Sequence, residues 1–194
     1  MTPTVRPATL ADAAALAVLV DIAGEGIPNW LWHTLAGPGA SALQLGRDRA
    51  RRDEGGFSYR RATILEVGDE IAAALIVYPL DDPYDLTGLD EMPAHVQSLV
   101  RLEAQAPGSW YVNVLATFPK FRGRGMGAKL LDIAETKGSE AGASVMSIIV
   151  GSWNEGAGRL YQRAGYATVA SEGAILPPDF PQHGDWVLMI KPLR

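Results

Sequence analysis

The sequence predicts a mixed α/β fold, of the α+β type, in which helices flank one central sheet of about seven mostly antiparallel strands. Two strand-like runs, residues 58–67 and 70–78, meet at Gly68-Asp69, a pair typical of tight antiparallel hairpins. Between residues 110 and 164, apolar strand-like runs alternate with helical patterns. Two further strand-like runs close the chain without a helix between them, so the sheet is mixed rather than wholly parallel.

The segment ahead of the hairpin is expected to be mainly helical after one short strand. Thr9 to Asp12 (TLAD) fits a capping box that opens a helix reaching about Ala23. Glycine and proline break the pattern at 24–28, and Asn29 is placed to cap the short apolar helix that follows. The elements expected here are a strand at 5–7 and helices at 9–23, 30–36 and 41–52.

Residues 80–108 are the least regular stretch, acidic and turn-rich at first and helical at about 94–104. We interpret this stretch as an insertion that supports or covers a site. The whole chain, residues 1–194, is expected to form a single domain, because its glycine and proline breaks lie too close together for linkers. The remaining expected elements are strands at 110–117, 144–150, 166–170 and 186–191 and helices at 125–141 and 155–164.

The composition excludes several classes of function. The chain has no cysteine, so it has no disulfide framework, thiol nucleophile or thiolate metal site, and no metal-ligand spacing is evident. A net charge of −5 argues against nucleic acid as the main partner. No apolar run approaches a membrane span, and no basic leader precedes the first apolar run, so a cytoplasmic protein without membrane contact is expected. Two basic clusters suit a small anionic ligand: Arg47, Arg49, Arg51 and Arg52, and Lys120, Arg122, Arg124 and Lys129.

Residues 122–128 read RGRGMGA and lie between a strand-like run and a helical pattern. A tight strand-to-helix turn is the simplest explanation, because glycine permits turns. Gly123, Gly125 and Ala128 also satisfy the dinucleotide fingerprint, but residues 118–122 separate them from the strand and too few parallel strands follow. A P-loop is excluded because no Gly-Lys-Ser/Thr follows. A third explanation is a backbone cradle for phosphate at a helix start.

The run from Leu115 to Gly127 resembles the first signature of the GNAT superfamily, the GCN5-related N-acetyltransferases. That signature is Leu-x-Val-x-Pro followed by Arg/Gln-x-x-Gly-x-Gly/Ala, and the matching residues here are Leu115, Thr117 in place of valine, Pro119, Arg122, Gly125 and Gly127. The second signature, Asn-x-x-Ala-x-x-Leu-Tyr with a later Gly-aromatic pair, is matched by Asn154, Ala157, Leu160, Tyr161, Gly165 and Tyr166. The clear resemblance covers about residues 110–170.

The resemblance implies that acetyl-CoA is the co-substrate and that two central parallel strands splay apart around its pantetheine arm. These strands correspond to 110–117 and 144–150. The glycine turn would hold the pyrophosphate through backbone N–H groups and nearby arginines. The implied cofactor contacts are Leu115, Ala116, Thr117, Arg122, Gly123, Arg124, Gly125, Met126, Gly127, Ala128, Asn154 and Tyr161.

The resemblance also implies a catalytic acid, because Tyr161 corresponds to the tyrosine that protonates the departing thiolate. Many members place a glutamate general base where this chain has Asn113, and an amide cannot accept a proton at neutral pH. Asn113 could instead hold a water in the catalytic site. The base is therefore a water chain, a residue of the 80–108 insertion, or unnecessary because the amine arrives deprotonated. Candidates within the insertion are Glu91, His95 and Glu103.

The acceptor is expected to be the primary amine of a small molecule, such as an amino acid or an antibiotic, or of a peptide or protein terminus. Trp30, Trp32, Tyr84 and Trp110 could line an apolar acceptor pocket near the insertion. Acidic residues could attract a cationic amine: Asp81, Asp82, Asp85, Asp90 and Glu91. Two alternatives stay open, a non-catalytic acyl-CoA-binding domain on the same fold and an acyltransferase that uses a longer acyl-CoA. Homodimer formation, frequent in the family, is a further possibility.

Overall fold

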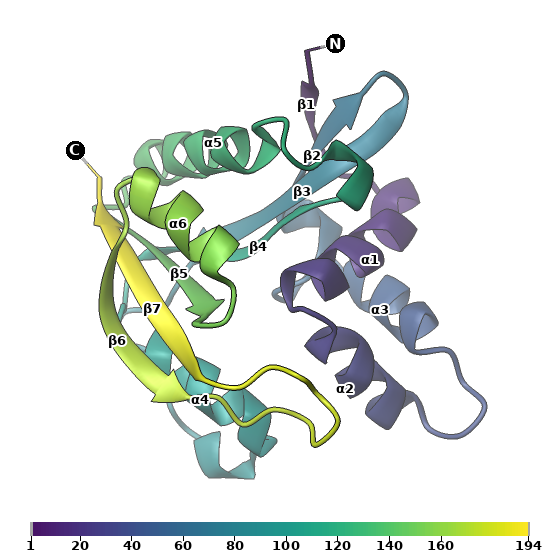
Figure 1. The fold of residues 1–194 in the computed structure, drawn as a ribbon, viewed down its shortest axis with the longest axis vertical. Coiled ribbons are helices and arrows are strands. Elements are labelled where there is room, and N and C mark those ends of the chain that lie inside the picture. Colours follow the sequence, from purple (N-terminus) through teal and green to yellow (C-terminus); the bar gives the residue numbers. More distant parts are fainter. Residues whose placement is uncertain (1, 194) are drawn as a thin grey trace. The chain divides into compact units, whose positions relative to one another are not determined.

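The computed structural model describes residues 2–193, and in that range the chain forms seven strands and six α-helices (Figure 1). The strands are β1 (Thr4–Pro7), β2 (Ala62–Val67), β3 (Glu70–Pro79), β4 (Trp110–Thr117), β5 (Val145–Gly151), β6 (Ala167–Gly173) and β7 (Asp185–Pro192). The α-helices are α1 (Ala13–Ala23), α2 (Ile27–Ala36), α3 (Ala42–Ala50), α4 (Ala94–Glu103), α5 (Met126–Glu140) and α6 (Glu155–Arg163). None of the helices in this range is long and apolar enough to cross a membrane.

The strands form one sheet in the order β1-β2-β3-β4-β5-β7-β6. β4 and β5 are parallel, with Trp110 opposite Met146 and Val112 opposite Ile148. The pairs β1–β2, β2–β3, β5–β7 and β6–β7 are antiparallel. The mixed, mostly antiparallel seven-stranded sheet with a parallel pair is therefore confirmed.

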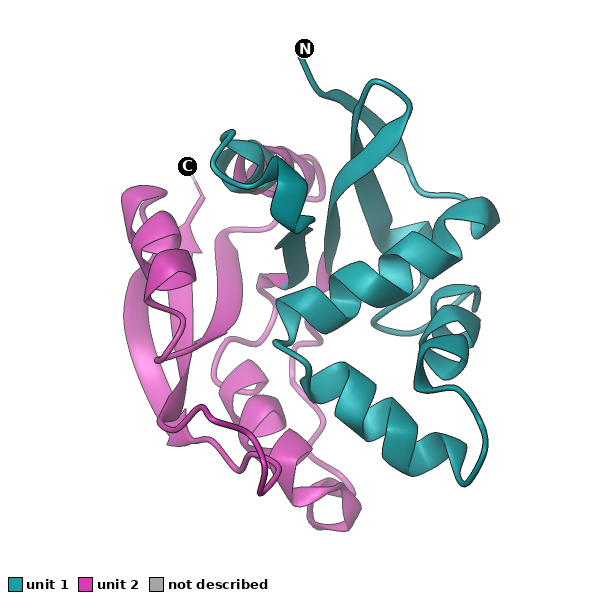
Figure 2. Cartoon of the chain, turned by 45° about the vertical axis from the view of Figure 1, so that its right-hand side comes forward, with its two compact units in different colours: residues 1–77, 113–130 teal, residues 78–112, 131–194 magenta. Residues whose placement is uncertain are grey.

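The chain divides into two compact units, each built from two separate segments (Figure 2). Unit 1 combines the chain up to Val77 with Asn113–Leu130, and unit 2 combines Tyr78–Val112 with the chain from Leu131 onward. The 80–108 insertion therefore lies wholly within unit 2. The single domain expected over residues 1–194 stays a prediction.

Unit 1 has its core between the β2–β3 hairpin and the N-terminal helices. Ile64 and Leu65 of β2 are fully buried, and so is the run from Ala72 to Ile76 of β3. α3 packs against both α1 and α2. The close approach of α2 and α3 requires a glycine, because a Cβ at Gly46 would lie 2.4 Å from the ring of buried Trp32. A glycine inside a helix costs about 1 kcal/mol in propensity, which this packing offsets.

Unit 2 has its core on β5 and β7, where Met146 and Leu188 are fully buried. α4 packs against β6 and β7. Two buried hydroxyls join the segment before β4 to β5, since Ser109 Oγ and Ser147 Oγ lie 2.6 Å apart. Ser109 Oγ also donates to the Ala106 carbonyl at 2.7 Å, so both hydroxyls of this pair are hydrogen-bonded.

Two local predictions from the sequence are wrong. Asn29 is not a helix cap, because α2 begins at Ile27 after the left-handed Gly26. The Asn29 N–H donates to Asp21 Oδ1 instead. Ser58 does not begin a strand. Its hydroxyl accepts from Arg60 N and donates to the Arg52 carbonyl. These bonds turn the chain into a short 3₁₀ segment, η2 (Tyr59–Arg61). Local side-chain hydrogen bonds of this kind compete with strand pairing.

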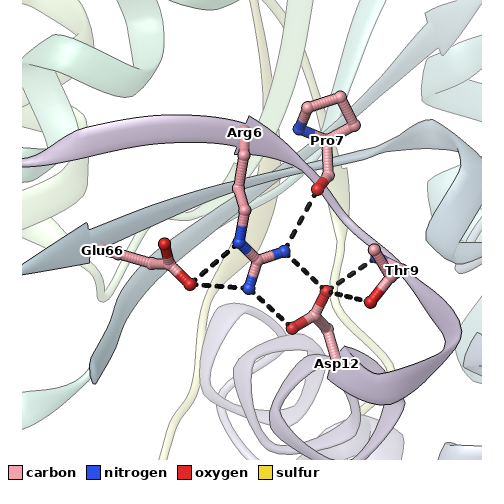
Figure 3. Close-up of polar contacts among 5 residues, drawn as sticks. All are labelled: Arg6, Pro7, Thr9, Asp12 and Glu66. Carbon is pink, nitrogen blue, oxygen red and sulfur yellow. Dashed lines mark hydrogen bonds and ion pairs between the residues drawn. The ribbon is translucent and has the colours of Figure 1, made fainter. Parts of the chain in front are cut away.

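An arginine-centred cluster ties the start of the chain to the hairpin and to the first helical turn (Figure 3). The Arg6 guanidinium donates to both carboxylate oxygens of Asp12 at 2.8 Å and to Glu66 Oε1 on β2 at 2.8 Å. Asp12 Oδ2 also accepts from Thr9 N at 2.7 Å, as the TLAD capping box predicts. The Arg6 hydrogen bonds lower the pKa of Asp12 to about 2, although burial acts in the opposite direction.

We predict that Asp12→Asn lowers the free energy of unfolding at pH 7 on the order of 2 kcal/mol. The Asp12 carboxyl has a lower pKa in the folded than in the unfolded chain. The contribution of this carboxylate to stability is therefore complete above its pKa in the unfolded chain, near 4. It is lost as the pH falls toward 2. Urea unfolding of both proteins between pH 7 and pH 2.5 should show the difference shrinking. Asp53→Asn is the control, because Asp53 forms an exposed pair with Arg60 and should have little effect. A difference that stays constant with pH would contradict the assignment.

Candidate functional site

The glycine turn lies in unit 1 between β4 and α5, and its conformation explains two of its glycines. Gly123 has φ +73° and Gly125 has φ +77°, a left-handed backbone that side chains rarely adopt. A Cβ at either position would meet no described atom within 4 Å. Glycine is therefore required here by the backbone, and the space beside it leaves the main chain open to a ligand.

The turn leads directly into the N-terminus of α5. The first helical hydrogen bond runs from Lys129 N to Gly125 O at 3.1 Å. The N–H groups of Met126, Gly127 and Ala128 precede it, at the end of a 15-residue helix where the macrodipole favours anions. An anionic group such as a pyrophosphate fits this arrangement.

Basic side chains surround a buried aromatic ring in the same turn. Phe121 is 5% exposed. Lys120 Nζ lies 4.9 Å and the Arg124 guanidinium carbon 5.5 Å from the centroid of its ring. Lys120 also pairs with Glu70 of β3. Arg122 folds back, donating from Nε to the Thr117 carbonyl at 3.3 Å. The turn therefore combines positive charge with a fixed backbone, as anion binding requires.

The predicted contacts on β4 are brought together with this turn in unit 1. Leu115, Ala116 and Thr117 form the last residues of β4. Asn113 lies two positions earlier, and its Nδ2 donates to the Gly56 carbonyl at 2.8 Å, which ties β4 to the segment before β2. A carboxylate at this position would face a carbonyl oxygen, so the local structure favours the amide over the glutamate common in the family.

The second motif lies in unit 2 and is built from the two ends of α6. Asn154 is the N-cap residue, and its Oδ1 accepts from Ala157 N at 3.1 Å. At the other end Gly165 has φ +94°, Gly165 N donates to Gln162 O, and Tyr166 N donates to Tyr161 O. This is the Schellman arrangement, which also brings its flanking side chains into contact. The rings of Tyr161 and Tyr166 lie 6.2 Å apart, and Tyr161 is 6% exposed.

The three candidate bases of the insertion differ in their surroundings. Glu91 is exposed at the end of a 3₁₀ turn, η3 (Leu89–Glu91). His95 is partly buried at the start of α4, and burial lowers its pKa. Glu103 ends α4 and accepts from the Tyr84 hydroxyl at 2.5 Å, and burial raises its pKa. Only Glu103 of these three combines a raised pKa with a phenol donor.

The tryptophans expected near the acceptor have different roles. Trp32 is 1% exposed and packs on Gly46, so it belongs to the core of unit 1. A further aromatic pair, which the sequence pattern does not reveal, lies beside the second motif. Its members are Trp153 and Trp186, whose rings meet at 4.9 Å and 62°. A Cβ at Gly151 would lie 2.3 Å from the Trp153 ring, so the glycine at the end of β5 makes room for it. No cluster of metal-ligating side chains occurs within residues 2–193.

The parallel strand pair and the glycine turn fit the class of acyl-CoA-dependent acyltransferases that the sequence resembles. A family model described as "Acetyltransferase (GNAT) family" matches residues 27–166, which is more than half of the chain. The chain therefore belongs to the GNAT acetyltransferase family, as the resemblance indicated. No curated protein matches the chain.

Solved structures share the fold at low sequence identity. One is the polyamine N-acetyltransferase of Drosophila melanogaster, described as catalysing the formation of N-acetylagmatine (17% identity, 99% of this chain and 100% of the other, TM-score 0.68). Another is a putative acetyltransferase from Salmonella typhimurium with its cofactor acetyl-CoA (19% identity, 100% and 95% coverage, TM-score 0.59). A third is an N-acetyltransferase from Staphylococcus aureus Mu50 (18% identity, 96% and 99% coverage, TM-score 0.64).

The cap role of Asn154 leads to a stability prediction. Asn154→Ala should lower the free energy of unfolding by about 1 kcal/mol, because Ala157 N loses its acceptor. Asn154→Ser is the matched variant, since a serine hydroxyl can cap the same N–H group. Chemical denaturation followed by circular dichroism measures both. Equal losses in the two variants would show that the cap is not what this side chain contributes.

Proposed function

We propose that this protein is an N-acetyltransferase that transfers the acetyl group of acetyl-CoA to a primary amine. The observation that carries the proposal is the turn at Gly123 and Gly125, whose left-handed backbone opens the N-terminus of α5 to an anionic ligand. Membership of the GNAT family and a structural neighbour solved with acetyl-CoA support the same cofactor.

In this proposal the turn from Arg122 to Ala128 binds the pyrophosphate of coenzyme A. Its backbone N–H groups donate to the phosphate oxygens, and the side chains of Arg122 and Arg124 supply positive charge. The main chain of Leu115, Ala116 and Thr117 pairs with the pantetheine arm in the manner of an added strand. When bound, acetyl-CoA supplies a thioester whose carbonyl is polarised by an N–H group near Leu115 or Ala116.

Tyr161 is proposed to give its phenol proton to the coenzyme A sulfur as the thiolate leaves. An ordinary phenol and an ordinary thiol differ in pKa by only about 1.5, so this transfer is energetically accessible. Asn154 would position this acid by fixing the start of α6, the helix that carries Tyr161. Asn113 would hold a water rather than act as a base, because an amide does not take up a proton.

A primary amine is the acceptor class that the comparisons favour. The Drosophila melanogaster neighbour is named for polyamines and for forming N-acetylagmatine, and other neighbours are named as an agmatine and an arylalkylamine N-acetyltransferase. These names describe proteins of under 25% identity, so they suggest a class of acceptor and no particular compound.

One observation favours a second candidate, a non-catalytic domain that binds acyl-CoA. The Asn113 amide occupies the position of a frequent catalytic glutamate and is engaged with the Gly56 carbonyl. A protein that only binds acyl-CoA would keep the glycine turn and lack turnover with every amine.

Calorimetric titration tests the proposal first. Acetyl-CoA should bind with micromolar affinity, and NAD should not bind. Longer acyl-CoAs should bind no more tightly than acetyl-CoA. A panel of primary amines is then screened by release of coenzyme A thiol. Binding of acetyl-CoA without release for any amine would favour the binding domain. Absence of binding to every acyl-CoA would overturn both candidates.

Tyr161→Phe separates an enzyme from a binding domain. The variant should lower kcat roughly 100-fold, because the departing sulfur loses its proton donor, while the Kd for acetyl-CoA stays within twofold. Tyr166→Phe is the matched control, because the buried Tyr166 hydroxyl has no hydrogen-bond partner among residues 2–193 and its ring packs on Tyr161. Steady-state kinetics and titration measure the two quantities. Equal kcat losses in both variants would indicate a packing effect and would contradict the acid role.

A further inference from the structure

A carboxylate in unit 2 lies within a group of tyrosines that the proposed function does not yet use. Glu103 ends α4, and its Oε2 accepts from the Tyr84 hydroxyl at 2.5 Å. Tyr111 of β4, 5% exposed, also hydrogen-bonds the Glu103 carboxylate. The Tyr111 ring meets the ring of Tyr78 edge-on at 5.7 Å and 73°. We call Tyr78, Tyr84, Glu103 and Tyr111 the tyrosine–glutamate cluster.

The charge of this cluster is not balanced by a cation. Within residues 2–193 no lysine, arginine or histidine forms an ion pair with Glu103, and none contributes to the shift of its pKa. Arg101, on the same helix, pairs instead with Glu172 of β6 at 3.5 Å. The groups that act on Glu103 are therefore the phenols of Tyr84 and Tyr111. Besides burial and Glu103, Tyr78 and Asp81 also act to raise the pKa of Tyr84, and Tyr78 to raise that of Tyr111.

Burial and the phenols act on Glu103 in opposite directions. Burial is the larger effect and raises the pKa of the carboxyl, whereas the hydrogen bonds from Tyr84 and Tyr111 lower it. The pKa values of both phenols are raised, first by burial, so the phenols remain proton donors at neutral pH. A carboxylate whose pKa is raised by burial is a stronger general base than an ordinary exposed one.

A purely structural role does not explain why this residue is a glutamate. A partly buried anion without a counter-cation is costly, and a glutamine oxygen would accept the same phenol hydrogen bonds without that cost. The charge therefore suits a ligand that is itself cationic or carries a proton to give up. A protonated primary amine has both properties.

The cluster also lies on the strand pair that the proposed function uses. Tyr111 stands opposite Ser147 in the parallel ladder of β4 and β5. The proposed function lays the acyl arm along β4. Glu103 and Tyr84 both come from the 80–108 insertion, so the insertion brings a carboxylate to Tyr111, a residue of this strand pair.

We propose that Glu103 is the general base that removes the proton from the acceptor ammonium, with Tyr84 as its positioning residue. This inference rests on the proposed function. The proton moves from the ammonium nitrogen to a Glu103 carboxylate oxygen, and the nitrogen lone pair forms the new N–C bond to the acyl carbon. The C–S bond breaks, and the thiolate takes its proton from Tyr161. The acylated nitrogen loses its second proton to solvent and becomes the neutral amide. Transfer of the Glu103 proton to solvent and of one solvent proton to Tyr161 then restores the starting state, so the reaction releases one net proton.

The main test compares Glu103→Gln with Glu140→Gln, which replaces an exposed glutamate that likewise ends a helix. The probe is acetyl-CoA with each primary amine that the wild-type chain acetylates. Glu103→Gln should lower kcat/KM about 100-fold at pH 7 and leave the Kd for acetyl-CoA unchanged. The loss should shrink above pH 9, because a primary amine with a pKa near 10 then arrives partly deprotonated. Glu140→Gln should match the wild type throughout.

Tyr84→Phe gives a second readout that a structural role does not predict. Its hydroxyl lowers the pKa of Glu103, so its removal should raise that pKa and move the acidic limb of kcat/KM to higher pH. The variant should therefore lose more activity at pH 6 than at pH 9. This comparison also holds if Glu103→Gln proves too unstable to assay.

The outcomes separate this inference from the proposed function. If the wild-type chain acetylates an amine while Glu103→Gln keeps its rate, or loses it equally at every pH, Glu103 is not the base. An unshifted acidic limb in Tyr84→Phe equally overturns the positioning role. If the wild-type chain acetylates no amine, the proposed function fails and this inference fails with it.

Discussion

The parallel pairing of β4 and β5 is the constraint on which the rest of the structure depends. Parallel strands cannot be joined by a tight turn, so a crossover must connect them, and here the crossover is α5. A second helix, α6, follows β5. Both sequence motifs lie at these strand-to-helix junctions. The topology of one strand pair thus determines where the chain carries its recognisable chemistry.

The motifs were predictable because they are local chemistry at helix ends. Gly123 and Gly125 are needed for a left-handed backbone, Asn154 caps α6, and Gly165 with Tyr166 closes it. Such requirements involve neighbours within a few residues, so a single sequence reveals them. The strands and helices from residue 62 onward were expected within a few residues for the same reason, since their apolar periodicity is local.

The wrong predictions arose where one local signal competed with another. Asn29 has the side chain of a cap, but Gly26 and Pro28 start α2 earlier, and Asp21 of α1 takes the Asn29 N–H. Ser58 precedes a strand-like pattern, but its hydroxyl bonds to the main chain on both sides. The sequence offers Glu103 as one of three candidate bases in the insertion, but it does not distinguish Glu103 from Glu91 and His95. Tyr84 and Tyr111, which define the surroundings of Glu103, lie 19 residues before it and eight residues after it, and only folding brings them together.

Asn113 and Glu103 together suggest how the 80–108 insertion relates to the sheet. The Asn113 amide holds β4 to the segment before β2, and a carboxylate there would oppose the Gly56 carbonyl. A base on that position of β4 would therefore conflict with the hydrogen bond that anchors the strand. A carboxylate on α4 avoids this conflict, because its phenol donors come from Tyr84 and Tyr111 and not from the backbone of the sheet. In the proposed mechanism this separation lets β4 keep a structural amide while the proposed base lies on an element that can vary with the acceptor amine.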